Sequence, residues 1–482
     1  MKKIMTLVLA LSMLLTLVLP MTSCSTVAHL SRMEETKRAY YFYSITDLNM
    51  SYASSGMFDR KMTLDATING VAYKQTSEST VTFVSDRNSL NLLEKAKTTV
   101  DTVGGGTVIY TDTGYLDGMM FLHTKEGGNE TSLKSAVSLE DYGAYNQYMN
   151  GKAPAIDVSA DSVKTVTCKM NDDETWTATY EDFTPAGLVP FLYMLWGIDY
   201  YVTAEYEIVD VRMTVNADAK LYPTNTKIEF IFSENSEATS NAPVIILENT
   251  YRGWDNVTME NYDISSFTEV DDLRALNIFL DALLEKGYED SGIMEATVTS
   301  TSRNSSNGYV NTETNKQRLT FNNANGFTFD LSYDVDGYEY KMNYADGDLS
   351  VRIYDAKSDR LVDSSTEAMP ESDAHATVAQ LIDPEGLTIR SISDVHILNA
   401  EEGTCKFTLS DAVKNAYKEQ YEAMGLSMKS FEGYCLVTMK DGVLTEYCIH
   451  IEMNLRMSGA SIQSTVDMII AFPTVEQGAE TV

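Results

Sequence analysis

Histidine, cysteine and positive charge are all scarce in this sequence, and the shortages exclude several classes of function. Only five histidines occur among 482 residues, and none stands in the HxxxH, HExxH or HxH spacing of a metal site. The nucleophile motifs GxSxG and SxxK and the phosphate-binding motif GxxxxGK[ST] are also missing. We therefore expect a protein that has no cofactor, binds no metal and does not act as an enzyme. A hydrolase that uses an unrecognised pair of carboxylates is the least favoured alternative.

Basic residues are outnumbered by acidic ones. Lysine and arginine together number 36 against 70 aspartates and glutamates, which gives a net charge of −34 at pH 7. Such a chain repels nucleic acid and anionic lipid, so neither is an expected partner. The charge fits either solubility at an exposed cell surface or the binding of cations, and we favour the first interpretation.

The cysteines follow no metal-binding pattern. Besides Cys24 the chain has Cys168, Cys405, Cys435 and Cys448, without a CxxC pair. Several of them lie in strand-like runs, where a free cysteine packs as a small apolar residue. An export compartment would permit disulfides, but we expect mostly free thiols.

The N-terminal segment has the pattern of a secretory signal. Lys2 and Lys3 precede an apolar run from Ile4 to Leu19, and Met21-Thr22-Ser23-Cys24 follows. The segment resembles a bacterial lipoprotein signal, in which a small residue precedes a cysteine that becomes the lipidated N-terminus. The resemblance implies cleavage after residue 23 and a lipid anchor on Cys24. An ordinary secreted protein cut elsewhere and an uncleaved membrane helix are the alternatives.

This signal also predicts a location. No second run reaches the roughly 18 apolar residues needed to cross a bilayer. We expect an extracytoplasmic protein held by its lipid to the outer face of a bacterial cell membrane, of the Gram-positive type.

Strict alternation is the strongest structural pattern. Phe327 to Val335, Tyr338 to Tyr344 and Leu349 to Ile353 alternate apolar and polar residues, and Asp-Gly pairs separate the three runs. Period two indicates strands with one buried face, and Asp-Gly between such runs favours tight hairpin turns. The same alternation occurs from Ile449 to Met457 and from Val466 to Phe472. The pattern predicts an antiparallel meander with one solvated face.

Helices are predicted at few places. Residues from about Glu269 to Lys286 have an apolar stripe, with Thr268 as the N-cap and Gly287 as the end. A second helix is expected from Asp411 to Met424, capped by Ser410 and ended by Gly425.

The N-terminal half repeats this order of elements, with a helix near Val27–Tyr43. Gly56-Met57 matches Gly292-Ile293, and the turn at Gly114 matches that at Gly347. The run Trp176–Tyr180 and a following helix near 185–196 match residues 405–409 and their helix. We predict a tandem duplication. The expected parts are a signal (1–23), a tether (24–34), two domains (35–260 and 266–475), a linker near 254–266 and a tail (476–482).

A helix, a hairpin-rich sheet and a helix before the closing strands together resemble the LolA/LppX-like lipoprotein carrier fold. The resemblance covers nearly all of the mature chain, once in each half, and rests on hydrophobic and turn patterns. It implies an α+β fold of two tandem domains, each a curved antiparallel half-barrel with helices packed on its concave face. In that family the concave face leaves an apolar cavity for acyl chains.

One segment is apolar on all sides. Residues 188–196 read Leu-Val-Pro-Phe-Leu-Tyr-Met-Leu-Trp, and such a helix is buried, faces lipid or lines a ligand cavity. We favour a helix that fills the core of the sheet. A helix that lines an acyl-chain pocket is the second interpretation, and contact with the membrane is the third. The predicted ligand contacts of this segment are Leu188, Phe191, Leu192, Leu195 and Trp196.

Two functions are therefore favoured over a hydrolase. The first is a membrane-anchored lipoprotein that binds a hydrophobic or amphipathic ligand without catalysing a reaction. The second is a structural or interaction lipoprotein of the cell envelope without a small-molecule ligand. A solute receptor with two α/β lobes is disfavoured, because the chain has many strands for each helix.

Overall fold

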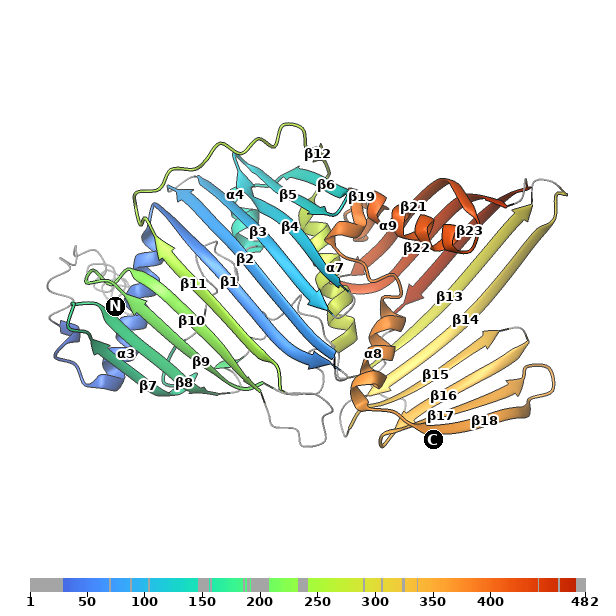
Figure 1. Cartoon of the computed structure of the whole chain (residues 1–482), viewed down its shortest axis with the longest axis horizontal. Coiled ribbons are helices and arrows are strands. Elements are labelled where there is room, and N and C mark those ends of the chain that lie inside the picture. The colour runs from blue at the N-terminus through green and yellow to red at the C-terminus, as the bar shows by residue number, and fades with distance from the viewer. Residues whose placement is uncertain are drawn as a thin grey trace, which may run out of the picture.

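The structure is a computed structural model that describes residues 29–473, and each half of this range builds one large β-sheet (Figure 1). Gaps in the description fall at 69–70, 87–88, 103–104, 146–155, 157, 185–186, 189–190, 192–207, 233–241, 289–290, 305–306, 323–325, 336, 441 and 458–459.

The first sheet has twelve strands. In chain order they are β1 (Ser55–Ile68), β2 (Val71–Ser85), β3 (Leu90–Thr102), β4 (Gly105–Leu116), β5 (Met119–Glu126), β6 (Asn129–Ala136), β7 (Val163–Met170), β8 (Trp176–Phe183), β9 (Ile208–Ala217), β10 (Pro223–Phe232), β11 (Val244–Arg252) and β12 (Thr268–Glu269). Across the sheet they lie in the order β12-β6-β5-β4-β3-β2-β1-β11-β10-β9-β8-β7. Neighbours are antiparallel except β12, which runs parallel to β6.

The second sheet has eleven strands. They are β13 (Ser291–Asn304), β14 (Val310–Asn322), β15 (Thr328–Val335), β16 (Tyr338–Ala345), β17 (Asp348–Asp355), β18 (Arg360–Ala368), β19 (Ile392–Asn399), β20 (Thr404–Leu409), β21 (Ser427–Lys440), β22 (Val443–Met457) and β23 (Ala460–Ala471). Their order across the sheet is β18-β17-β16-β15-β14-β13-β23-β22-β21-β20-β19.

The two sheets share one strand order. In each, six strands form a meander, and the last strand of the unit returns to pair with the first, β11 with β1 and β23 with β13. Two large antiparallel sheets with few helices agree with the predicted β-rich, two-domain architecture. The common order is what a tandem duplication predicts, and the exact domain boundaries stay a prediction.

The helices occupy matching places along the chain. They are α3 (Glu35–Tyr52) before β1, α4 (Leu139–Tyr145) after β6, α7 (Leu273–Tyr288) before β13, α8 (Glu371–Ile382) after β18 and α9 (Asp411–Ala423) between β20 and β21. A 3-10 turn, η2 (Ile389–Ser391), precedes β19. Most of the helix expected near 185–196 lies outside the described residues.

The hairpins form where alternation and Asp-Gly pairs predict them. Phe329 and Leu331 are buried on β15 whereas Asp330 between them is exposed. Asp346 and Gly347 both have positive φ, at 53° and 83°, as a two-residue turn between β16 and β17 requires.

One matched turn is predicted wrongly. Gly114 lies within β4, paired with Phe121, and the turn glycine of that hairpin is Gly118, with φ 85°. Gly118 rather than Gly114 is therefore the counterpart of Gly347. Gly114 is needed for a different reason, because a Cβ there would lie 2.0 Å from the carbonyl oxygen of Leu92.

Helix α9 begins and ends as expected. The Ser410 side chain accepts a hydrogen bond from the Ala412 backbone N–H, and Gly425 after the helix has φ 79°. The other two predictions are displaced. Helix α3 begins at Glu35 rather than near Val27. At this start the Glu34 carboxylate accepts hydrogen bonds from two backbone N–H groups. Helix α7 begins at Leu273, because Thr268 and Glu269 pair with β6 as β12 instead of capping the helix.

We call the side of each sheet on which α3 or α7 packs its inner face, and the other side its outer face. On the first sheet, Phe42 of α3 lies 6.2 Å from Trp176 and Tyr43 lies 5.7 Å from Tyr180, measured between ring centroids. On the second sheet, Phe279 of α7 lies 5.2 Å from Phe407. Helix α3 therefore covers the β7–β11 part of the first sheet, and helix α7 covers the β19–β23 part of the second.

The two halves share a hydrophobic core. One cluster of buried side chains contains Tyr115, Leu122 and Leu133 of the first sheet together with Leu276 and Phe279 of α7. The Leu273 backbone N–H donates to the Ser135 hydroxyl at 3.0 Å across the same boundary. The first sheet therefore packs its β4–β6 side against the second half of the chain.

The segment between the halves lies on the outer face of the first sheet. Met259, Tyr262, Ile264 and Phe267 pack against a small core that includes Phe121. The Tyr262 hydroxyl donates to Asp112 at 2.7 Å. Within the described part of the chain, no helix is both long and apolar enough to cross a membrane.

Candidate functional site

The two sheets can be compared position by position. Both β1 and β13 begin with Ser-Gly, and both glycines, Gly56 and Gly292, pair with a phenylalanine on the next strand. When the two glycines are aligned, Arg60 of the first sheet is equivalent to Ala296 of the second. The strand registers then give, for each sheet, one row of inner-face residues at equivalent positions. We call these the matched rows. The first is Asn249, Arg60, Ser79, Ala96, Thr111, Thr124 and Thr131, and the second is Ile470, Ala296, Gln317, Tyr333, Tyr340, Ile353 and Asp363.

The matched row of the first sheet is polar. Arg60 Nη1 lies 3.5 Å from Glu94 Oε1, and Arg60 Nε donates to Asn249 Oδ1 at 3.3 Å. The Ser79 hydroxyl donates to the same Glu94 carboxylate at 2.7 Å. The Arg60 and Glu94 side chains are only 20% and 18% exposed. Their charges are therefore largely compensated by one another and by neutral partners.

Removing one member of this pair should cost stability. Glu94→Leu, which introduces the residue of the second sheet (Leu331), is expected to lower the free energy of unfolding by about 1–3 kcal/mol, because the guanidinium loses its carboxylate. Adding Arg60→Met should recover at least half of the loss. Urea unfolding followed by tryptophan fluorescence measures both effects.

The control uses an ion pair between β1 and β2 on the outer face of the same sheet. Lys61 and Glu78 form an ion pair of 2.8 Å with both side chains more than half exposed, so Glu78→Leu should change stability far less. Equal losses for Glu78→Leu and Glu94→Leu would contradict the structural role of the inner pair.

The matched row of the second sheet is aromatic and aliphatic. The rings of Tyr333 and Tyr340 stack with centroids 4.9 Å apart and planes 1° apart. Ile353 follows on β17, directly opposite Tyr340. All three side chains are only half-buried. At the same places the first sheet has Ala96, Thr111 and Thr124, so the fold itself does not require large apolar residues here.

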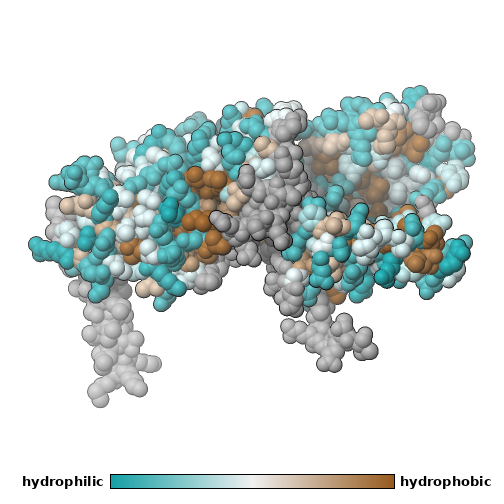
Figure 2. Space-filling view, turned by 60° about the horizontal axis from the view of Figure 1, so that its bottom comes forward, coloured by the Kyte–Doolittle hydropathy of each residue, from teal (hydrophilic) through white to brown (hydrophobic). Residues whose placement is uncertain are grey.

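Half-buried apolar side chains continue on both sides of this row. Val298 and Met468 are paired across β13 and β23, and Met342 and Val351 across β16 and β17. Figure 2 shows a recess in the right-hand half of the molecule with hydrophobic side chains at its base. We define the second-sheet hollow by the half-buried apolar side chains that the strand registers bring together on the inner face: Val298, Tyr333, Tyr340, Met342, Val351, Ile353 and Met468.

Tyrosines in the hollow are kept in their neutral form. Burial raises the pKa of Tyr333, and the neighbouring Tyr340 adds to the effect. Burial likewise raises the pKa of Tyr344, with smaller contributions from the carboxylates of Glu371, Asp348 and Asp373. Carboxylates therefore lie close to Tyr344, the buried neighbour of the hollow on β16.

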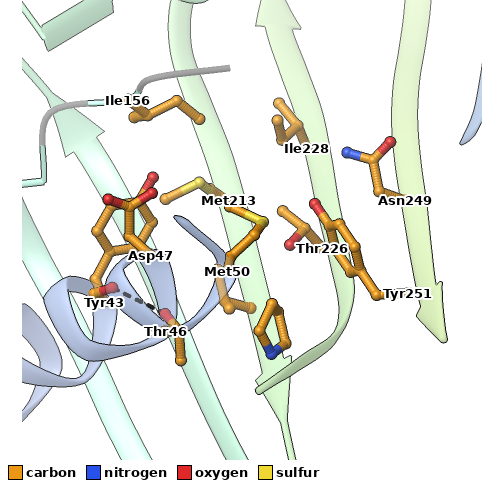
Figure 3. A pocket seen from close by; sticks show the side chains of 12 residues that line it. Tyr43, Thr46, Asp47, Met50, Ile156, Met213, Thr226, Ile228, Asn249 and Tyr251 are labelled. Atoms are coloured by element: carbon orange, nitrogen blue, oxygen red, sulfur yellow. Dashed lines mark hydrogen bonds between the residues drawn. The ribbon is translucent and has the colours of Figure 1, made fainter. Parts of the chain in front are cut away.

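The first sheet has a small cavity on its inner face. Beneath α3, a cavity of about 30 Å³ separates the helix from β9–β11 (Figure 3). Its lining residues are Tyr43, Thr46, Asp47, Met50, Ile156, Met213, Val215, Pro223, Thr226, Ile228, Asn249 and Tyr251. This volume is close to that of one water molecule. At this cavity the described side chains of α3 and β9–β11 therefore pack closely, whereas the second sheet leaves an apolar surface half open.

Two of the predicted ligand contacts belong to the hydrophobic core of the first half, and the other three lie outside the described residues. Phe191 is fully buried, with its ring centroid 4.9 Å from that of Phe183 and 6.5 Å from that of Phe230. Leu188 is half-buried against the same cluster. Leu192, Leu195 and Trp196 lie outside the described residues. That these five contact a ligand stays a prediction.

Reactive groups are not gathered anywhere in the described chain. All four cysteines that the structure describes are free, as expected. Burial raises the pKa of Cys168 to about 12 and that of Cys448 to about 11, so these thiols stay protonated at neutral pH. No group of three or more metal-ligating side chains occurs in the same part of the chain.

The comparisons with known proteins leave the family open. No protein-family model and no curated protein matches the chain. Solved structures align with the chain at low similarity, and three of them serve as examples. A transferrin binding protein B double mutant from Haemophilus parasuis Hp5 has 5% identity over 88% of this chain and 76% of its own, with TM-score 0.15. A putative AttH from Nitrosomonas europaea has 8% identity over 86% and 92%, with TM-score 0.14. The β-domain of the Bordetella autotransporter BrkA has 7% identity over 87% and 99%, with TM-score 0.10. Scores this low carry no argument about fold or function.

Proposed function

We propose that this protein is a non-enzymatic, membrane-anchored extracytoplasmic lipoprotein that binds a hydrophobic or amphipathic ligand in the second-sheet hollow. The anchor is the lipid on Cys24 that the signal sequence predicts. The proposal includes the carrier-like arrangement in which each sheet curves around its helices. The observation that carries it is the half-exposed apolar row Tyr333, Tyr340 and Ile353, which the matched row of the first sheet replaces with small residues.

Contact between this apolar surface and water is unfavourable, so a ligand that covers the surface would lower the free energy. Completing the burial of each half-exposed apolar side chain contributes on the order of 1 kcal/mol, before the entropic cost of association. Stacked tyrosines add a rigid platform, since an aromatic ring loses little conformational freedom on binding. Both features favour a ligand with an extended apolar part.

The test replaces hollow residues by those of the first sheet. Tyr340→Thr with Ile353→Thr keeps two strand-forming residues but removes most of the apolar surface between β16 and β17. We expect the affinity for dodecyl maltoside, measured by calorimetry below its critical micelle concentration, to fall at least 10-fold. Native mass spectrometry after organic extraction should show the co-purified ligand on the unmodified protein only.

The control lies on the other face of the same strand. Tyr354 is half-buried on the outer face of β17, where Lys341 Nζ lies 5.1 Å from its ring centroid. Tyr354→Thr should leave the affinity unchanged. If neither protein binds the probe, the proposed ligand-binding function is wrong.

An interaction lipoprotein without a small ligand is the second candidate. The filled inner face beneath α3, with its cavity of about 30 Å³, favours it for the first sheet. Absence of any extractable ligand, together with unchanged probe binding in the hollow variant, would support this alternative.

A further inference from the structure

Two of the three charged side chains on β18, the edge strand beside the second-sheet hollow, are acidic. On the edge strand β18, Asp363 lies directly opposite Ile353, and Glu367 lies directly opposite Leu349 of the inner face. Both carboxylates are exposed. Neither forms an ion pair with a lysine or arginine among the residues that the structure describes. The third charged residue of the strand, Arg360, lies opposite Asp355, whose carboxylate it faces.

The fold does not require these carboxylates. Register places Thr131 and Ser135 of β6 where β18 has Asp363 and Glu367. Ser135 is fully buried and accepts a hydrogen bond from the Leu273 backbone N–H. At these two positions the first sheet thus has neutral side chains on β6, which packs against the second half, whereas the second sheet has exposed acids on its edge strand β18.

Acidic groups also lie on the α8 side of the hollow. The carboxylates of Glu371 and Asp373, in the first turn of α8, both act on the buried Tyr344 hydroxyl. Phenol rings attract cations through their faces, and carboxylates attract them directly. Rings and carboxylates therefore favour the same kind of ligand group.

From this arrangement we infer that the occupant of the second-sheet hollow is a cationic amphiphile. Its apolar part lies against Tyr340, Val351 and Ile353, and its positive group lies towards Asp363 and Glu367. The inference rests on the proposed function and adds the charge of the ligand to it. Charge on an edge strand has another known use, since it prevents pairing with a second sheet. The experiment separates the two.

Three amphiphiles with the same dodecyl chain are compared on the full-length protein. Dodecyltrimethylammonium, dodecyl maltoside and dodecyl sulfate are titrated below their critical micelle concentrations at low salt. We expect the cationic head to bind at least 10-fold more tightly than the anionic one, with the neutral head between them. The preference should shrink in 0.5 M salt, because salt screens exposed charges.

Two variants with equal charge locate the preference. Asp363→Asn with Glu367→Gln should lower the affinity for the cationic amphiphile at least 5-fold and leave that for the maltoside within 2-fold. Asp334→Asn with Glu339→Gln removes two carboxylates that face each other on the outer side of β15 and β16, and it should retain the preference.

Each failure has a distinct meaning. Equal binding of all three heads overturns the inference and leaves the proposed function standing. A full cationic preference in the Asp363→Asn, Glu367→Gln protein also overturns it, and the acids then serve only to protect the edge. Binding of none of the three rejects the proposed function as well.

Discussion

Phe279→Ala is expected to lower the free energy of unfolding by about 3–5 kcal/mol, the usual cost of removing a fully buried phenylalanine. Phe279 is 0% exposed and contacts the rings of Phe407 and Tyr447, at 5.2 and 6.0 Å between centroids. Its cluster extends to Leu133 of the first sheet. The substitution should therefore destabilise both halves of the chain together.

Tryptophan fluorescence reads this effect selectively. All three tryptophans, at 176, 196 and 254, precede the second sheet, and Phe279 lies in the second half of the chain. A lower urea midpoint by fluorescence in Phe279→Ala would show that the sheets unfold as one unit. Ile278 on the same helix is 43% exposed, so Ile278→Ala is the control and should cause little change. An unchanged fluorescence midpoint, with an earlier transition by circular dichroism, would mean that the halves unfold independently.

Cys24→Ala is expected to abolish lipid attachment completely. The sequence Met21-Thr22-Ser23-Cys24 predicts a single acylated cysteine. Each buried acyl CH₂ contributes about 0.8 kcal/mol, so several chains on one residue hold a domain firmly to a membrane. Incorporation of a labelled fatty acid, and the mass of the N-terminal peptide, should both change to those of an unmodified chain.

A buried cysteine provides the matched control. Cys168 is 0% exposed, so Cys168→Ala should keep the full lipid label. A label that persists in Cys24→Ala, or that is missing from the unmodified protein, would reject the lipoprotein interpretation.

The strands were the most predictable part of the fold, because each repeats a physical pattern at every second residue. Phe329 and Leu331 alternate with exposed residues, and the Asp346-Gly347 turn adopts the positive φ angles that only such residues adopt easily. Ser410 and Gly425 delimit α9 for equally local reasons.

Features that depend on contacts between distant residues were predicted less well. The start of α7 is displaced because Thr268 and Glu269 pair with β6, more than 130 residues earlier in the chain. The Arg60, Glu94 and Asn249 network joins three strands that are far apart in sequence. No local pattern indicates either contact.

The candidate site was predictable only in its composition. The alternating tyrosines of β15 and β16 are visible in the sequence, but a strand pattern does not say which part of a buried face a helix covers. The expected ligand segment at 188–196 was chosen because it is apolar on all sides. Phe191 of that segment is a buried residue in the structure, and a half-open apolar surface that the sequence did not single out lies on the second sheet.

The position of β23 makes the second sheet depend on the last strand of its unit to be synthesised. This strand lies between β13 and β22 and is the link, in the described sheet order, that joins the β13–β18 meander to β19–β22. Until residue 471 has been synthesised, no strand joins these two parts of the second sheet. Closure of this sheet therefore follows synthesis of the whole unit, and cleavage just before residue 460 would leave the sheet in two parts.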